Sequence, residues 1–329
     1  MQNKPLFRVK KTKLFKGNLV SLTLSVIIAT KDRLQALTEC LESLQRQTVP
    51  PQTVIIIDAS ANKKAEVTAK RILEKENINL VYKNSKPGLT YQRNLGIRQN
   101  PNELVLFIDD DVILDSNYIK EIKSIFLNDP AGKIGGVTGR IQPGKQKSIL
   151  SILIRKIFCL SEPGRGEVKK SFANNSIHPR YVDEMFEVQW LSGCNQCYRK
   201  EVFNDFLFDE NLASYAYMED VDFSFRVGQK YKLIFIPHAR LVHNIQVSHD
   251  TRLRKREKQR MFMLNLYYLF KKNQSQTLTY KFCHYWSYIG YLLRGLLLER
   301  SFAFTMGTVQ GIMMNLSGKN PLMKLLREK

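Results

Sequence analysis

Apolar runs alternate with helix-like segments between Leu22 and about Asp129, and this alternation restricts the chain to few folds. Ser25-Val-Ile-Ile-Ala-Thr30 is the first apolar run, helical periodicity follows in Arg33–Gln47, and Val54–Asp58 has the composition of a second buried strand. Such alternation is typical of βαβ units, which build a largely parallel sheet. We therefore predict an α/β fold whose amino-terminal part contains a doubly wound sheet.

The carboxyl ends of the predicted strands carry polar side chains. Thr30, Asp58 and Asp109 each lie at or just past the end of an apolar run. Ligands bind at this edge of open α/β sheets, so the three residues are expected to line one crevice. Beyond Pro130 the alternation weakens, and the Gly-, Lys- and Pro-rich stretches 132–144 and 161–171 are predicted to be mobile loops.

Length and charge divide the chain further. With 329 residues, one large domain and an appendage are expected. Most of the net charge of +21 lies in residues 1–20 and 246–329, which leaves the middle of the chain nearly neutral. We predict a basic N-terminal segment (1–20), a catalytic domain (21–246) and a basic, apolar helical extension (247–329).

Two features bear on the cellular compartment, and a third bears on metal binding. Five scattered cysteines in a chain of this length favour a reducing compartment, and hence the cytoplasm. The apolar run Leu19–Ala29 could be a signal sequence, but no small-residue cleavage site follows, so a buried first strand is favoured. Cys194 and Cys197 have the spacing of half a zinc site, but no second pair follows at a suitable distance.

Asp109-Asp110-Asp111 places three carboxylates where an apolar strand ends. Such a cluster repels itself, and a hard divalent cation that also bridges phosphate oxygens would compensate it. The alternative is a solvated turn or helix N-terminus ahead of a helix in residues 113–126, where aspartate is favourable without any metal.

Glu219, Asp220 and Asp222 crowd the start of another predicted helix. Capping accounts for one of these acids, and Asp222 with Arg226 at i,i+4 accounts for a second as a surface pair. Asp220 is left as a candidate general base.

Six sequence blocks, taken in order, resemble the family 2 glycosyltransferases. They are 25–33, the strand ending in Asp58, 88–97, 107–112, 190–195 and 218–222. The resemblance implies a GT-A fold and transfer of a sugar from a nucleotide-diphosphate sugar, with Mg²⁺ or Mn²⁺ as cofactor.

The same resemblance implies roles for individual residues. Asp220 would be the catalytic base, and Asp111 and His243 the metal ligands. Apart from the resemblance, we expect Trp190 and Glu219 on the acceptor side, although the aromatic ring of Trp190 fits a core position as well. The predicted nucleotide-sugar-binding residues are Thr30, Asp32, Arg33, Asp58, Arg93, Asn94, Asp109 and Asp110. One displacement would invert the anomeric centre. The Gln-x-x-Arg-Trp motif of processive synthases is absent, which favours addition of a single sugar to a glycan or lipid-linked acceptor in cell-surface polysaccharide synthesis.

The segments 261–270, 282–298 and 302–316 are apolar and aromatic-rich, and a basic run precedes them. They are too short or too interrupted to span a bilayer, so amphipathic helices on the anionic cytoplasmic face of the cell membrane are expected. The alternative is that they pack on the protein itself.

Two other functions remain open at this stage. A nucleotide-sugar-binding protein without transfer activity would need the metal cluster but not the base. A nucleic-acid-binding protein would explain the charge, but no nucleic-acid-binding motif is present, so we expect no nucleic-acid partner.

Overall fold

The structure, a computed structural model, describes residues 22–74, 77–142, 148–178, 181, 183–212, 216–244 and 254–327. The predicted N-terminal segment 1–20 lies outside these residues. Contacts divide the chain into two compact units. The first, called the sheet unit, comprises Met1–Gly144, Arg180–Phe208 and Phe223–Gln246. The second, called the helical unit, comprises Lys145–Pro179, Asp209–Asp222 and Val247–Lys329.

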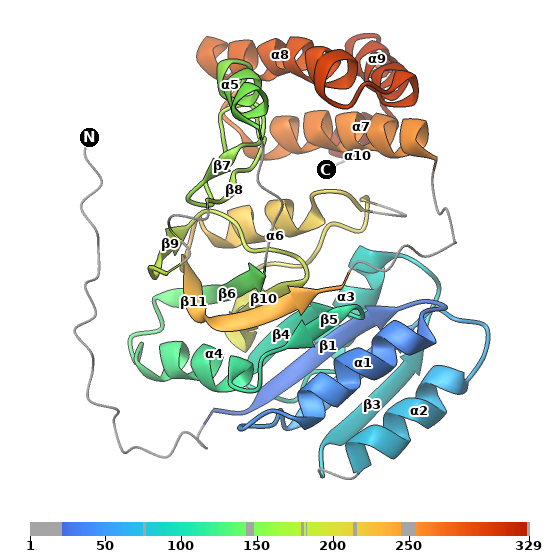
Figure 1. Cartoon of the computed structure of the whole chain (residues 1–329), viewed down its shortest axis with the longest axis vertical. Helices are drawn as coiled ribbons and strands as arrows, with labels where there is room; N and C mark the ends of the chain where they lie inside the picture. The colour runs from blue at the N-terminus through green and yellow to red at the C-terminus, as the bar shows by residue number, and fades with distance from the viewer. Residues whose placement is uncertain are drawn as a thin grey trace. The chain divides into compact units, whose positions relative to one another are not determined.

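The sheet unit is built on a mixed sheet in the strand order β3-β2-β1-β4-β10-β6-β11-β5, with β9 paired to β11 (Figure 1). Strands β3, β2, β1 and β4 are parallel to one another, as the sequence pattern predicts, and β10 pairs antiparallel with β4. The strands are β1 (Leu24–Thr30), β2 (Thr53–Asp58), β3 (Asn79–Asn84), β4 (Leu104–Asp109), β5 (Val112–Leu114), β6 (Ile134–Gln142), β9 (Phe186–Val188), β10 (Asn195–Arg199) and β11 (Lys232–His243).

Alternate strand residues pack on opposite faces of this sheet. Val26, Val54 and Leu106 belong to the core that α1, α2 and α4 cover. On the other face α3 approaches β1 so closely that a Cβ at Gly96 would lie 2.5 Å from Ile27 Cγ2. The helical elements of this unit are α1 (Leu34–Gln45), α2 (Lys64–Leu73), α3 (Leu89–Arg98), α4 (Tyr118–Leu127), η3 (Lys200–Asn204) and the end of α6 (Glu219–Val227).

The predicted mobile loop at 132–144 is wrong, because most of it forms β6. Its glycines are required by crowding rather than by flexibility. A Cβ at Gly136 would lie 2.7 Å from the Tyr198 ring, and one at Gly139 would lie 2.3 Å from the Ala239 carbonyl oxygen. Glycine inside a strand often marks such close approach of another chain segment.

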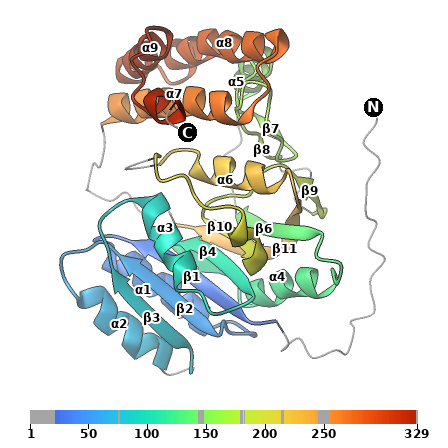
Figure 2. The same cartoon turned by 180° about the vertical axis from the view of Figure 1, so that it is seen from behind.

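The helical unit contains helices with two short strands. α7 lies against α9, and both views in Figures 1 and 2 show the two helices side by side. Gly307 and Gly311 permit this contact, because a Cβ at either would lie within 2.5 Å of α7 atoms. The elements are β7 (Pro163–Gly164), β8 (Ser176–Ile177), α5 (Ile149–Ile157), α7 (Lys255–Asn273), α8 (Leu278–Leu293), η4 (Arg294–Leu298), α9 (Phe302–Leu316) and α10 (Leu322–Arg327).

Residues 145–179 and 209–222 are grouped with the C-terminal helices, although they lie far from them in sequence. The linear boundary at 246/247 does not convey this grouping, and the three predicted domains stay a prediction. Among the described helices, none combines the length and apolar character needed to cross a bilayer.

A histidine is buried inside the helical unit. His284 on α8 stacks on Phe270 at 4.1 Å between ring centroids. Its Nδ1 lies 3.0 Å from the Ser171 carbonyl oxygen and its Nε2 lies 3.1 Å from the Tyr288 hydroxyl. Burial lowers the pKa of His284 to about 4, so the ring is neutral in the folded protein at physiological pH.

This pKa predicts acid sensitivity. The unfolded chain, with a histidine pKa of about 6.5, takes up a proton between pH 6.5 and 4 that the folded protein does not, so stability falls as pH falls through this window. Between pH 7.5 and 5 we expect His284 to account for a loss of about 2 kcal/mol in unfolding free energy. Urea unfolding of His284→Gln should lack that part of the pH dependence. His238→Gln, at an exposed histidine, is the control, and equal pH dependence in both variants would contradict the assignment.

Candidate metal and nucleotide-sugar site

The end of β4 brings three carboxylates to the carboxyl edge of the sheet. Ala29 lies opposite Asp109 in the β1–β4 pair, and Thr30 lies opposite Asp58 in the β1–β2 pair. The strand ends named in the sequence prediction therefore meet at one edge, as expected for parallel neighbours.

His243 reaches the same edge through a strand pair that the sequence did not reveal. β5 pairs antiparallel with the end of β11, so that His243 lies opposite Val112. The Asn244 amide also donates to the Asp111 carbonyl oxygen at 2.9 Å. The alternative of a helix directly after the Asp cluster is wrong, because β5 follows the cluster and α4 begins only at Tyr118.

Arg33 binds two of the three carboxylates. Its Nη1 lies 2.6 Å from Asp110 Oδ1 and its Nη2 lies 2.6 Å from Asp111 Oδ2. The Thr30 hydroxyl donates to the second oxygen of Asp110 at 2.7 Å. Both oxygens of Asp110 are therefore bonded within the protein, whereas Asp111 has one oxygen directed elsewhere.

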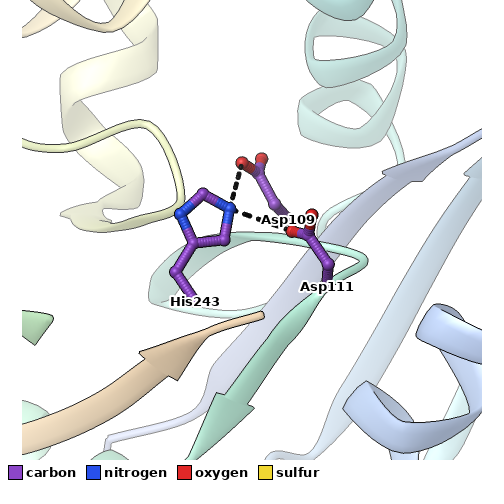
Figure 3. Close-up of side chains that lie close together, drawn as sticks. All are labelled: Asp109, Asp111 and His243. Atoms are coloured by element: carbon purple, nitrogen blue, oxygen red, sulfur yellow. Dashed lines mark ion pairs between the residues drawn. The ribbon is translucent and has the colours of Figure 1, made fainter. Parts of the chain in front are cut away.

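That second oxygen of Asp111 faces His243 (Figure 3). His243 Nε2 lies 3.0 Å from Asp111 Oδ1 and 3.8 Å from Asp109 Oδ2. The 3.0 Å contact is an ion pair without hydrogen-bond alignment, and Asp111 Oδ1 is buried with no hydrogen-bond partner among the described residues. Asp109, Asp111 and His243 each offer one ligand atom, all within 4.8 Å of one another. An orphaned carboxylate oxygen beside a second carboxylate and an imidazole fits a divalent cation.

The charges at the site shift several pKa values. The Asp111 carboxylate, and after it the Cys194 thiol, raise the pKa of His243 to about 10. Burial alone would raise the pKa of Asp111, but His243 and Arg33 hold it below its ordinary value. Asp110 is more deeply buried, and burial raises its pKa to about 7 against the opposing effects of Arg33 and Thr30. The charge of the Asp111 carboxylate is thus better compensated within the protein than that of Asp110.

Arg93 and Asn94 are both buried on α3. Arg93 Nη2 donates to the Gly193 carbonyl oxygen at 2.8 Å and lies 3.3 Å from Asp109 Oδ1. Asn94 exchanges two hydrogen bonds with the backbone of Phe208, at 2.9 and 3.0 Å. Arg93 therefore contacts the Asp cluster, while Asn94 fixes the chain at Phe208; their nucleotide-binding roles stay a prediction.

Asp58 and Asp32 lie at the ends of β2 and β1. The Asp58 carboxylate is fully buried and accepts hydrogen bonds from the backbone and hydroxyl of Ser60 and from the Tyr82 hydroxyl. Asp32 has a φ of 55°, which is uncommon outside glycine, and its amide donates to the Ser60 hydroxyl at 2.7 Å. Ser60 thus connects the two residues predicted near the nucleotide.

Trp190 is half-buried in the sheet unit, just before β10. Glu219 and Asp220 begin α6 and belong, with Asp222, to the helical unit. Glu219 and Asp222 are buried, whereas Asp220 is half-buried and accepts from the Val221 amide at 2.8 Å. Asp220 is therefore the most accessible of the three acids. The acceptor-side roles of Trp190 and Glu219 stay predictions.

Two residues at this edge were missed by the sequence analysis. Gln92 is buried and donates to the carbonyl oxygens of Thr30 and Ile57, at 3.1 and 2.8 Å, so it ties the ends of β1 and β2. It lies within the block 88–97, where the resemblance could have revealed it. Cys194, whose thiol lies beside His243, falls within the block 190–195, but the sequence analysis considered it only as half a zinc site.

A family comparison tests the resemblance directly. The family model described as glycosyl transferase family 2 matches residues 25–207. The chain belongs to this family. YwdF of Bacillus subtilis (strain 168), described as an uncharacterized glycosyltransferase, is 27% identical over 101 residues, which cover 31% of this chain and 37% of that protein. The sequence prediction of a family 2 glycosyltransferase is confirmed.

Solved structures show the same fold. The crystal structure of S. aureus TarS 1-349 has a TM-score of 0.54 at 15% identity and covers 91% of this chain and 82% of that chain. The mannosyltransferase PcManGT from Pyrobaculum calidifontis, in complex with GDP-Man and Mn²⁺, has a TM-score of 0.53 at 13% identity. The match covers 90% of this chain and 87% of the PcManGT chain. At identities this low, the similarity shows the fold alone. It confirms the prediction that this chain has the GT-A fold of these glycosyltransferases.

The Asp109–Asp111–His243 cluster predicts cation binding that can be measured without any enzymatic assay. Electron paramagnetic resonance measures the concentration of free Mn²⁺ in a solution of the protein, and binding lowers this concentration. We expect Asp111→Asn to weaken Mn²⁺ binding by roughly tenfold or more, because a charged ligand is lost. Asp115→Asn removes an exposed carboxylate four residues away and should leave binding unchanged. Equal Mn²⁺ affinity in the wild type and Asp111→Asn would exclude this site.

Proposed function

We propose that this family 2 member is a metal-dependent, inverting glycosyltransferase that moves one sugar from a nucleotide-diphosphate sugar to an acceptor hydroxyl. The observation that carries this proposal is the Asp109–Asp111–His243 cluster at the carboxyl edge of the parallel strands. Structural neighbours support a nucleotide-sugar donor, since TarS 1-349 was solved in complex with UDP-GlcNAc and PcManGT in complex with GDP-Man and Mn²⁺.

The proposed cofactor is Mg²⁺ or Mn²⁺, held by Asp111 and His243 with Asp109 beside them. Bound there, the cation would neutralise negative charge on the departing nucleoside diphosphate. The protein supports this arrangement with its own charges. Arg33 fixes the Asp111 carboxylate through one oxygen, and Arg93 contacts Asp109. Holding these carboxylates in place lowers the reorganisation needed when the donor binds.

Asp220 is the proposed catalytic base. In the transfer step its carboxylate would accept the proton of the acceptor hydroxyl while that oxygen forms a bond to the anomeric carbon. The bond from the anomeric carbon to the diphosphate oxygen breaks, and the electron pair leaves with the diphosphate. A single displacement of this kind inverts the anomeric configuration. Asp220 suits this role because its neighbours Glu219 and Asp222 are buried and it is the most accessible acid of the three.

Asp220→Asn separates binding from chemistry. First, UDP-, GDP- and dTDP-sugars are screened with Mn²⁺ for thermal stabilisation and for release of the nucleoside diphosphate. With the donor so identified, Asp220→Asn should keep the thermal shift and lose at least about 10²-fold in turnover. A variant that keeps both binding and turnover would contradict the role of Asp220. Absence of any donor-dependent shift in the wild type would instead contradict the proposed function.

The proposed acceptor is a glycan or lipid-linked intermediate in cell-surface polysaccharide synthesis, met at the anionic cytoplasmic face of the cell membrane. The five cysteines are free, which agrees with a reducing compartment. Exposed apolar side chains of the helical unit support a membrane surface. They are Ile149, Leu150, Leu153 and Ile157 on α5, Leu278, Phe282, Tyr285 and Ile289 on α8, Leu296 and Leu297 on η4, and Phe302, Met313 and Leu316 on α9.

Charge favours anionic lipid as the occupant of this surface. Residues 278–326 contain a single acid, Glu299, and it pairs with Arg294 at 2.7 Å. Arg300, Lys319 and Lys324 are exposed in the same stretch. Trp286 stacks between Phe158 and Phe282, at 5.0 and 5.8 Å. Aromatic and apolar side chains flanked by cations are typical of helices that lie on anionic bilayers.

Vesicle flotation tests this surface. The wild type should float with vesicles containing anionic phosphatidylglycerol and not with neutral phosphatidylcholine vesicles. Phe282→Ser combined with Leu297→Ser should lower partitioning by about tenfold or more, because two large apolar side chains are lost. Val67→Ser combined with Leu207→Ser, at exposed apolar positions of the sheet unit, is the control. If the first pair instead changed only the oligomeric state, the face would be a subunit interface.

A further inference from the structure

The segment that carries Asp220 has an unusual backbone. Ala216 and Met218 have φ values of 48° and 68°, in the left-handed region that side chains with a Cβ adopt rarely. The Glu219 amide donates to the Ala216 carbonyl oxygen at 3.1 Å, and the Asp222 amide donates to Met218 at 2.9 Å. Two such residues on either side of Tyr217 persist only where the surroundings determine their conformation.

One helix supplies those surroundings. Asn265 on α7 donates through Nδ2 to the Tyr217 carbonyl oxygen at 3.0 Å, between the two left-handed residues. The Phe262 ring contacts the Tyr217 ring edge-on, with centroids 6.4 Å apart. Asn265 is itself buried, so its amide is fixed by the packing of the helical unit.

The same helix holds the start of α6 through charge. Lys272 Nζ lies 2.6 Å from Asp209 and 3.0 Å from the fully buried carboxylate of Asp222. Asn273 donates to Asp222 at 2.8 Å, and the Tyr268 hydroxyl donates to Asp209 at 2.7 Å. Asp222 is therefore a buried anchor rather than the exposed helix-surface carboxylate that the sequence suggested.

These contacts recur along α7 at positions 262, 265, 268 and 272, which lie on one face of a helix. They hold the chain before Asp220 at Asp209 and Tyr217, and after it at Asp222. Asp220 itself lies between these points and is left half-buried. The contacted residues all belong to the helical unit.

We infer that α7 positions the proposed catalytic base, and that Lys272 and Asn265 are positioning residues that act through Asp220. The inference rests on the proposed function of Asp220. In this arrangement Lys272 and Asn273 fix the first turn of α6 by its buried carboxylate, and Asn265 fixes the strained peptide before it. The helical unit therefore contributes to the chemistry as well as to any attachment of the protein.

Lys272→Met is the first test. Small displacements of a catalytic group lower turnover strongly, so we expect kcat to fall about 10²-fold while the KM for the donor changes less than about twofold. Lys272→Arg should restore much of kcat, because it returns a cation to the two carboxylates. Lys271→Met is the matched control, since this neighbouring lysine is directed to Gln276 at 3.2 Å. Equal kcat in Lys272→Met and wild type would overturn the inference.

A double-mutant cycle separates positioning from general destabilisation. If Lys272 acts through Asp220, then Lys272→Met should cause no further loss of kcat in an Asp220→Asn background. Losses that multiply in the double variant would overturn the inference and leave the function of Asp220 intact. Full turnover of Asp220→Asn alone would contradict the proposed role of Asp220, and absence of donor binding by the wild type would contradict the proposed function, so these failures are distinguishable from failure of the inference.

Lys272→Met leaves two buried carboxylates without their cation and can prevent folding, which circular dichroism would reveal. In that case Asn265→Leu is the variant to test, because this change removes the hydrogen bond to the Tyr217 carbonyl oxygen without removing a charge. We expect kcat to fall about tenfold with an unchanged donor KM, and again no further loss in the Asp220→Asn background. A folded Asn265→Leu with wild-type kcat would overturn the inference.

Discussion

Three adjacent carboxylates at the end of one buried strand are the constraint on which the site depends. Their mutual repulsion must be balanced where solvent screening is weak. The protein meets this need with basic side chains from separate parts of the chain: Arg33 after β1, Arg93 on α3 and His243 at the end of β11. Because each of these side chains lies on a different element, the folding of the whole sheet unit is needed to hold Asp109–Asp111 in place.

The parallel half of the fold could be predicted from the sequence because its apolar runs alternate with helices, as in βαβ units. The carboxyl ends of parallel strands lie at the same edge of a sheet, so Thr30, Asp58 and Asp109 were expected to meet there even though β4 pairs with β1 rather than with β3. The position of His243 beside Asp111 had no such local signal. It depends on the pairing of β5 with β11, between residues well over a hundred positions apart, and only the family resemblance pointed to it.

Other errors have equally physical causes. Glycines in 132–144 look like loop residues, but in β6 they admit Tyr198 and the Ala239 carbonyl group into space that a Cβ would fill. Asp222 looked like a partner for Arg226 on the surface of α6, whereas it is buried and bound by Lys272 and Asn273. Composition and i,i+4 spacing describe the local chain and carry no information about which distant segment packs against it.

The contacts of α7 with residues 209–222 also bear on how separable the parts of this protein are. Cutting the chain before α7 would remove the proposed membrane-binding surface and would also leave Asp209 and Asp222 as buried carboxylates without Lys272. The C-terminal helices therefore cannot be exchanged by themselves. Exchanging them between family members would preserve the fold only if the segment ahead of α6 were exchanged with them, so these two stretches are expected to evolve together.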